Sequence, residues 1–223
     1  MDTAAIVREI ESRIAGLPVR NAPAMRAVRR EFSKRLRAAA PADVLAIAEE
    51  LIARGRVHRF MGDELIHERA GALAALDIAT VERLGAGISS WDQVDSFACL
   101  LAGPAWREGL IADRDIGRWA ASEDRWWRRA ALVSTVALNV KARGGSGDPR
   151  RTLRICRLLV DHRDDMVWKA LSWALRAAIP HDAEGVRRFV EANESRLAAT
   201  VRREVREKLN TVAGETACRT FRN

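Results

Sequence analysis

The sequence predicts an all-helical protein, and three observations support this class. Apolar residues recur with the 3.6-residue period of an α-helix along nearly the whole chain of 223 residues. No segment shows the convincing alternation of apolar and polar residues that marks a half-buried strand. Short basic motifs recur at spacings of roughly 40 residues, which is typical of stacked helix pairs. Hydrophobic residues make up 48% of the chain, so it can bury a sizeable core.

Proline, glycine and capping residues divide the helical pattern into segments. Asp124 and Asp148 are typical N-terminal caps, and Pro149 occupies the first helical position after Asp148. The glycine-rich run 144–147 predicts a loop, which lacks the Lys-Ser/Thr pair of a phosphate-binding loop. We expect helices over residues 2–16, 22–38, 42–54, 59–75, 78–86, 90–101, 104–110, 113–121, 123–142, 148–162, 164–179, 182–193 and 197–213.

Four basic positions recur in the first half of a predicted helix that follows a shorter one: Arg69, Arg129, Lys169 and Arg203. Spacings of about 40 residues are typical of HEAT-type helix pairs, whose second helices line a concave face. The sequence therefore predicts a right-handed α-solenoid of HEAT-like helix pairs with a concave basic face. The alternative is that these side chains are solvated and pair with local glutamates.

The charge balance favours an anionic partner. Lys+Arg number 38 against 30 Asp+Glu, for a net charge of +8, and only four of the basic residues are lysines. Arginine binds phosphate bidentately and stacks on flat rings, so this composition fits nucleic acid. A GC-rich genome is an alternative cause of the arginine-to-lysine ratio, but it does not explain the net charge.

The remaining composition argues against metal, cofactor and membrane chemistry. Cys99, Cys156 and Cys218 form no C-x-x-C pair, and the four histidines show no ligand spacing, so we expect no zinc site, metal or cofactor. Cys99 and Cys156 are expected to be buried thiols. The first sixteen residues are amphipathic and charged rather than a signal peptide, and no apolar run approaches a membrane span. We expect a cytoplasmic protein.

One candidate site centres on Trp91 and Asp95. They lie four residues apart and therefore share one face of a helix. Asp95 precedes the apolar run 96–101, and a carboxylate beside such a run needs a partner or a function. The alternative to a function is a structural ion pair with Arg129 or another arginine.

Further tryptophans accompany basic residues in two later helices. Of Trp126 and Trp127, one is expected to pack inward and the other to meet solvent or a groove. Trp173 shares a helix face with Lys169 and Arg176. For any single tryptophan the alternative is packing in the core.

These motifs resemble those of the DNA alkylation repair glycosylases of the AlkD type, which are built from HEAT-like repeats. The most specific element is Ser-Trp-Asp-x-Val-Asp at 90–95. Trp-x-x-Arg-Ala-Ala at 126–131, Lys-Ala-x-x-Trp-x-Leu-Arg at 169–176 and Arg-Arg-Glu at 202–204 follow in the family's order and approximate spacing. The resemblance covers most of the chain and is strongest from residue 90 to about residue 209.

The resemblance implies a role for several residues. Asp95 matches the catalytic aspartate, Trp91 and Trp173 match the tryptophans that flank the deoxyribose of the lesion, and Arg129 matches the arginine that holds the DNA backbone there. Trp127 is a further candidate for contact with the lesion. With Arg129, the candidate contacts to the DNA backbone are the recurring basic positions Lys169, Arg203 and Arg69.

The implied function is excision of cationic N3- or N7-alkylated purines from double-stranded DNA, without flipping the base out of the duplex. We expect a monomer with a single solenoid domain over residues 1–223. It would comprise N-terminal helices (1–86), the best-matching repeats (87–213) and a disordered tail (214–223). The alternative is a non-catalytic HEAT-repeat protein that binds distorted or branched DNA or a protein partner.

Overall fold

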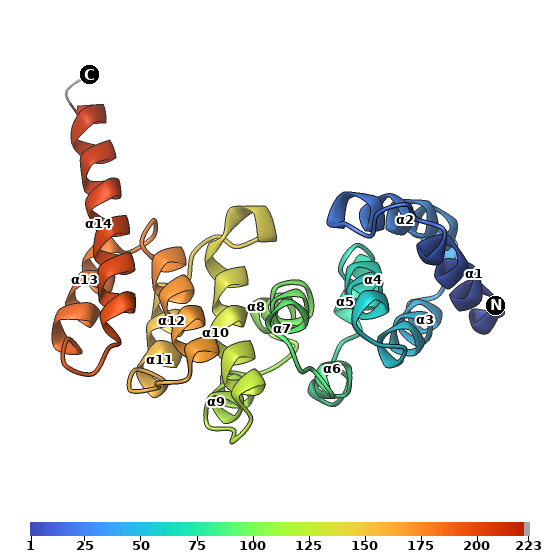
Figure 1. Ribbon diagram of the computed structural model, residues 1–223, viewed down its shortest axis with the longest axis horizontal. Helices are drawn as coiled ribbons and strands as arrows, with labels where there is room; N and C mark the ends of the chain where they lie inside the picture. Colours follow the sequence, from blue (N-terminus) through green and yellow to red (C-terminus); the bar gives the residue numbers. More distant parts are fainter. Residues whose placement is uncertain (221–223) are drawn as a thin grey trace. The chain divides into compact units, whose positions relative to one another are not determined.

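The computed structural model describes residues 1–220, apart from the side chains of Arg56 and residues 215–220. Within this range every regular element is helical and none is a strand, which confirms the predicted class (Figure 1). The chain forms two compact units, which we call the N-terminal unit (Met1–Ile88) and the C-terminal unit (from Ser89). The single solenoid domain, its handedness and its concave basic face stay predictions.

The N-terminal unit packs its helices around an apolar core. Helix α3 packs against α4 and α1, and α2 contacts α1 and α4. Ile10, Phe32, Ile47 and Leu51 are fully buried. The helices are α1 (Thr3–Ala15), α2 (Ala22–Arg35), the 3-10 turn η1 (Leu36–Ala38), α3 (Pro41–Ala53), α4 (Arg56–His67), α5 (Ala70–Ala74) and α6 (Ile78–Gly85).

The single helix expected over residues 59–75 is wrong. Helix α4 ends at His67, and Arg69 adopts an extended conformation before the short helix α5. The guanidinium of Arg69 donates a hydrogen bond to the carbonyl of Ala39 at 2.9 Å. This contact joins Arg69 to the residue that follows η1, thirty positions earlier, and nothing in the local sequence signals it.

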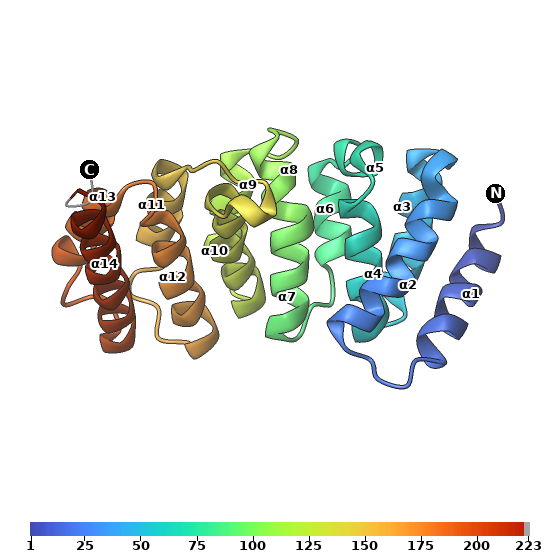
Figure 2. The same ribbon diagram turned by 90° about the horizontal axis from the view of Figure 1, so that it is seen from above.

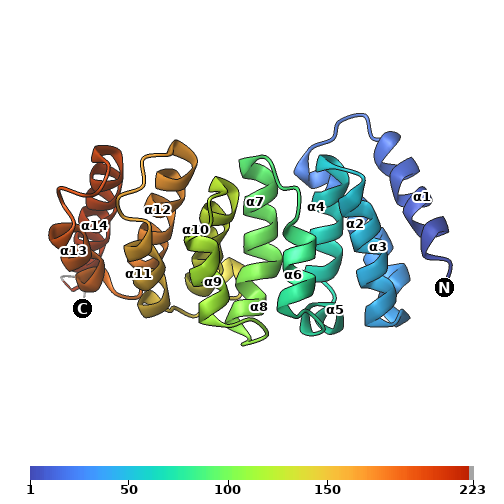
Figure 3. The same ribbon diagram turned by 90° about the horizontal axis from the view of Figure 1, so that it is seen from below.

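The C-terminal unit consists of helix pairs in two layers. Helices α10, α12 and α14 lie side by side in one layer, and α9, α11 and α13 in the other; Figures 2 and 3 show the layers from opposite sides. The elements are α7 (Trp91–Phe97), the π-helical turn η2 (Ala98–Ala102), α8 (Gly103–Arg107), α9 (Asp113–Ala120), α10 (Arg125–Asn139), the 3-10 turn η3 (Lys141–Arg143), α11 (Pro149–Leu158), α12 (Asp165–Ala178), α13 (Ala183–Ala192) and α14 (Ala199–Thr220).

Within this unit the first helix of each pair is the shorter one. Helices α9, α11 and α13 have 8, 10 and 10 residues, whereas α10, α12 and α14 have 15, 14 and 22. This arrangement is the one expected of HEAT-like pairs. Helix α14 continues to Thr220 and so covers most of the range predicted as a tail, while residues 221–223 lie outside the described residues.

Helices α7 and α8 form one continuous helical stretch, so the predicted break at Gly103-Pro104 is wrong. The Gly103 N–H donates to the Ala98 carbonyl five residues earlier, and this wider turn accommodates Pro104, which has no N–H. A Cβ atom on Gly103 would lie 2.6 Å from Cβ of Ala137, so the glycine allows α10 to approach closely.

Helix α10 is the centre of the C-terminal unit and is buried from Arg129 to Asn139. The predicted caps are confirmed: Asp124 accepts from the Trp126 N–H, and Asp148 accepts from the Arg151 N–H. The loop predicted at 144–147 is also confirmed, with Gly144 in the left-handed region at φ 80°. Cys99 and Cys156 are buried free thiols, as expected, whereas the side chain of Cys218 lies outside the described part.

Candidate functional site

Helix α7 presents Trp91 and Asp95 one turn apart. Trp91 is the first residue of the helix and is 55% exposed, which makes it the most exposed of the seven tryptophans. The Asp95 side chain is 19% exposed. Large apolar side chains normally stabilise a fold by being buried. An indole that stays exposed one turn from a half-buried carboxylate is therefore unusual for a purely structural role.

Arg129 on α10 holds the Asp95 carboxylate from the protein side. Its Nε and Nη2 donate to Oδ1 and Oδ2 of Asp95, each at 2.9 Å, and its Nη1 donates to the Met166 carbonyl at 2.6 Å. These bonds use three of the five N–H donors of the guanidinium. Arg129 is only 6% exposed. It therefore ties α7, α10 and α12 together and fixes the orientation of the carboxylate.

The surroundings of Asp95 alter its ionisation. Burial raises the pKa of Asp95 above its usual range, while the hydrogen bonds and charge of Arg129, and the charge of Arg143, act in the opposite direction. Once ionised, the carboxylate lies in a poorly solvated place, where its charge acts more strongly than in water. Burial raises the pKa of Cys99, one turn further along, to about 12, so this thiol stays protonated at neutral pH.

Trp127 lies in an aromatic cluster with Trp119 and Phe97. Its ring centroid is 4.9 Å from that of Trp119 and 5.9 Å, edge-on, from that of Phe97, which lies two residues after Asp95. Trp126 lies instead against the Arg125 guanidinium, 4.9 Å from the ring centroid. Trp127 is thus the inward-packed member of the pair, and its contact with a lesion stays a prediction.

Trp173 is half-buried on α12, two turns after Met166. Next to it, the Ser172 hydroxyl donates to a Glu204 carboxylate oxygen at 2.5 Å, and Nε of Arg176 donates to the Ser172 hydroxyl oxygen at 3.2 Å. These bonds tie α12 to α14 beside the indole.

Two of the other basic positions, Lys169 and Arg203, have local partners. Lys169 forms an ion pair with Asp165 at 2.9 Å, and Arg203 lies 3.9 Å from Glu207, in each case four residues along the same helix. Lys169 and Arg203 belong to the C-terminal unit and Arg69 to the N-terminal unit. Lys169 and Arg203 therefore pair with local carboxylates, as the alternative interpretation expected. A basic surface shared by all four positions stays a prediction.

The structure adds groups that the sequence did not single out. The Met166 carbonyl has no sequence signal, because any residue carries one. The sequence shows Phe97 and Trp119 as apolar residues at helical spacing. It does not show that they contact Trp127, because this contact depends on how three helices pack. Arg143 was missed because its segment was interpreted from the glycines alone.

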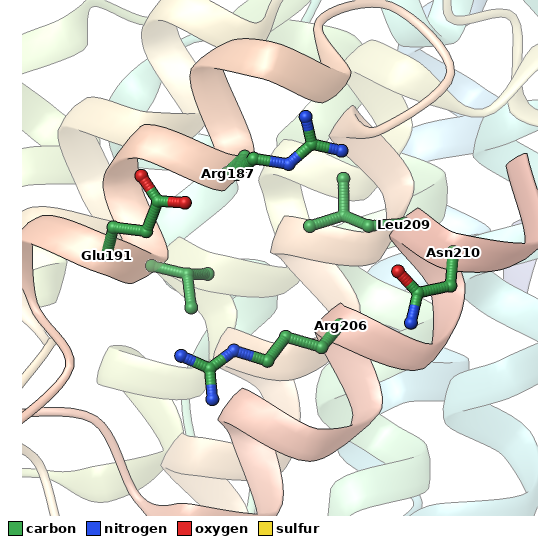
Figure 4. A pocket seen from close by; sticks show the side chains of 6 residues that line it. Arg187, Glu191, Arg206, Leu209 and Asn210 are labelled. Atoms are coloured by element: carbon green, nitrogen blue, oxygen red, sulfur yellow. The ribbon is translucent and has the colours of Figure 1, made fainter. Parts of the chain in front are cut away.

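A small pocket of about 120 Å³ lies between α13 and α14, and Figure 4 shows the side chains that line it. Arg187, Glu191, Arg206, Leu209 and Asn210 surround it. None of the predicted site residues lines this pocket. Across the described residues, no cluster of three or more His, Cys, Asp or Glu side chains could hold a metal ion.

The C-terminal unit is thus made of paired helices, and its α7 carries a carboxylate that is bound by a buried arginine and lies one turn from an exposed tryptophan. The sequence model of the DNA alkylation repair enzyme family matches residues 16–209. The chain therefore belongs to the DNA alkylation repair enzyme family, which supports a role in alkylation repair with DNA as the substrate. A comparison with curated protein sequences found no match. No helix in the described range has both the length and the hydropathy needed to cross a bilayer.

Proposed function

We propose that the protein is a DNA glycosylase that releases cationic N3- or N7-alkylated purines from duplex DNA. The observation that carries the proposal is the state of Asp95. Arg129 fixes both carboxylate oxygens from one side, yet the side chain remains partly exposed beside Trp91. A purely structural ion pair would not require the exposed indole.

The chemistry needs little more than one oriented carboxylate. An N3- or N7-alkylated purine carries a positive charge, so it departs with the electrons of the glycosidic bond as a neutral base and needs no general acid. Positive charge develops on the sugar as the bond breaks. Asp95 stabilises this charge and orients the water that adds to C1′, which is half of the usual two-carboxylate arrangement of glycosidases.

The tryptophans complete the proposed site. The face of an indole attracts a cation, so Trp91 and Trp173 stabilise the charged sugar and base. Trp127 packs against Phe97 and Trp119, and we assign it a role in contact with the lesion or in holding α7 in position. Because the lesion is approached from the sugar side, no base-flipping pocket is required, and a monomer suffices.

DNA binding is the second part of the proposal. Lys169 and Arg203 are exposed on α12 and α14, and each can exchange its neighbouring carboxylate for a DNA phosphate, since exposed ion pairs contribute little stability. We propose that Arg69 also binds a DNA phosphate, from the N-terminal unit. For Arg129 we propose orientation of Asp95 as the main role, because three of its donors already serve Asp95 and Met166.

The test is release of free 7-methylguanine from methylated duplex DNA under single-turnover conditions. We expect release by the unaltered protein and a rate about 10²–10³ lower for Asp95→Asn, the usual loss when one charge-stabilising group is removed. Asp92→Asn, on the same helix, is the matched control and should release base at nearly the unaltered rate. Equal rates for Asp95→Asn and the unaltered protein would exclude the catalytic role. No release by either would move the protein to the binding-only class.

A further inference from the structure

A second arginine, Arg143, acts on Asp95 through its charge and lies in the turn η3 that follows α10. Turn η3 ends at Arg143, and Gly144 then reverses the chain with φ 80°. The positive charge of Arg143 acts on both Asp95 and Cys99, which lie one turn apart on the same helical stretch. Arg107, on α8 at the end of this stretch, donates a hydrogen bond to the Arg143 carbonyl, so η3 is tied to the helical stretch that carries Asp95.

Backbone hydrogen bonds fix this loop in place. Nη1 of Arg107 donates to the Arg143 carbonyl at 2.9 Å and to the Ala137 carbonyl at 3.1 Å, which joins η3 to α8 and to the end of α10. The Gly145 N–H donates to the Val140 carbonyl at 3.1 Å. Figure 1 shows this segment, in yellow, at the end of α10. The position of Arg143 is therefore built into the fold.

Arg143 differs from Arg129 in what it has left to bind. Among the described residues no ion pair joins Arg143 to a carboxylate, and its side chain is half-buried rather than enclosed. Arg129 is enclosed and already donates to Asp95 and Met166. To bind a phosphate with these donors, Arg129 would have to release the carboxylate that the reaction requires.

We propose that Arg143 binds the DNA phosphate that flanks the reaction site. A guanidinium matches the oxygens of a phosphodiester, and a rigid loop positions it without further loss of side-chain and backbone freedom. The bound phosphate would hold the sugar of the damaged nucleotide against Asp95. The proposal rests on the proposed function only for this catalytic consequence, since phosphate binding can be measured on undamaged DNA.

The experiment compares Arg143→Gln with Lys141→Gln, a control in the same turn whose side chain is exposed. Binding of an undamaged duplex is measured by fluorescence anisotropy over a range of salt concentrations. Loss of one charge-assisted contact should weaken binding by Arg143→Gln about tenfold at low salt. It should also lower the slope of log affinity against log salt by about 0.9. Lys141→Gln should retain the slope of the unaltered protein.

Two further readouts separate phosphate binding from a structural role. Arg143→Lys keeps a positive charge and should restore most of the salt slope, and thermal denaturation should show that Arg143→Gln is folded, because the backbone carbonyl bound by Arg107 is retained. Removing this cation should also move the acid limb of excision to higher pH, given that Arg129, Arg143 and Asp92 are the charges acting on Asp95. An unchanged salt slope in Arg143→Gln, or an equal loss in Lys141→Gln, would overturn the proposal. A reduced slope without any base release would keep Arg143 and reject the glycosylase.

Discussion

Each unit of the protein buries an arginine on a central helix, and the two arginines differ in what they hold. Arg59 on α4 is 5% exposed and donates to the backbone carbonyls of Leu84 and Ala86 at 2.5 and 2.7 Å. Arg129 on α10 is 6% exposed, but it holds a carboxylate as well as a carbonyl. Burial of an arginine therefore does not identify a site.

The two arginines differ in the partner that each one binds and in whether this partner reaches the surface. Arg59 donates to two carbonyls at the C-terminal end of α6, those of Leu84 and Ala86, which is a structural role. Arg129 leaves its partner Asp95 partly exposed beside Trp91. The first arrangement stabilises a fold, whereas the second also presents an oriented negative charge to whatever binds there.

The largest expected difference is between the variants that lack Arg129 and Arg59, measured as stability and as rate of excision. Arg129→Met strands the Asp95 carboxylate and should cost about 3 kcal/mol of stability, with excision falling about 10²–10³ because the carboxylate is no longer oriented. Arg59→Met should cost about 1–3 kcal/mol for its unsatisfied carbonyls and leave excision by the folded protein unchanged. Urea denaturation and single-turnover release measure both quantities. Comparable excision losses in the two variants would remove the distinction.

A smaller effect is expected when an exposed and a buried tryptophan are each replaced by alanine. Trp91→Ala should slow excision about tenfold, the worth of one cation–π contact of 1–2 kcal/mol, with little change in melting temperature because the indole is already exposed. Trp106, which is 1% exposed, is the matched control: its replacement by alanine should cost about 3–5 kcal/mol of stability. If Trp91→Ala instead unfolds the protein, this tryptophan belongs to the core.

The third expected effect is on pH dependence. Burial raises the pKa of Asp95, and the proposed mechanism requires the ionised carboxylate, so the rate of excision should fall with decreasing pH at values above the usual range of aspartate. In Arg129→Met the loss of a cation should shift this limb to still higher pH. Spontaneous loss of the base in acid, measured without protein, is subtracted. An acid limb at the ordinary aspartate value in the unaltered protein would contradict the described surroundings of Asp95.

Local signals predicted much of this structure. The 3.6-residue period located the helices, Asp124 and Asp148 marked their starts, and a spacing of four residues placed Trp91 and Asp95 on one face. The ion pair between Asp95 and Arg129, weighed as the alternative to a function, is present. The Asp95 side chain nevertheless stays partly exposed, so the two interpretations do not exclude each other.

Contacts between distant segments were not predictable from the sequence. Gly103-Pro104 is a strong local breaker, yet close packing against Ala137 and a π-helical turn carry the helix through it. The meeting of Trp127 with Trp119 likewise depends on how helices pack. A one-dimensional pattern records which residues are apolar or charged, but not which neighbour each one finds.

In the proposed mechanism, one oriented carboxylate acts on a base that already carries positive charge. The most direct measurement is single-turnover base release from a panel of duplexes that each contain one defined lesion. The protein should release 3-methyladenine and 7-methylguanine, and it should fail on uracil and 8-oxoguanine, whose neutral bases require a leaving-group proton or a binding pocket. Efficient release of uracil would contradict the account, because it would require a second catalytic group.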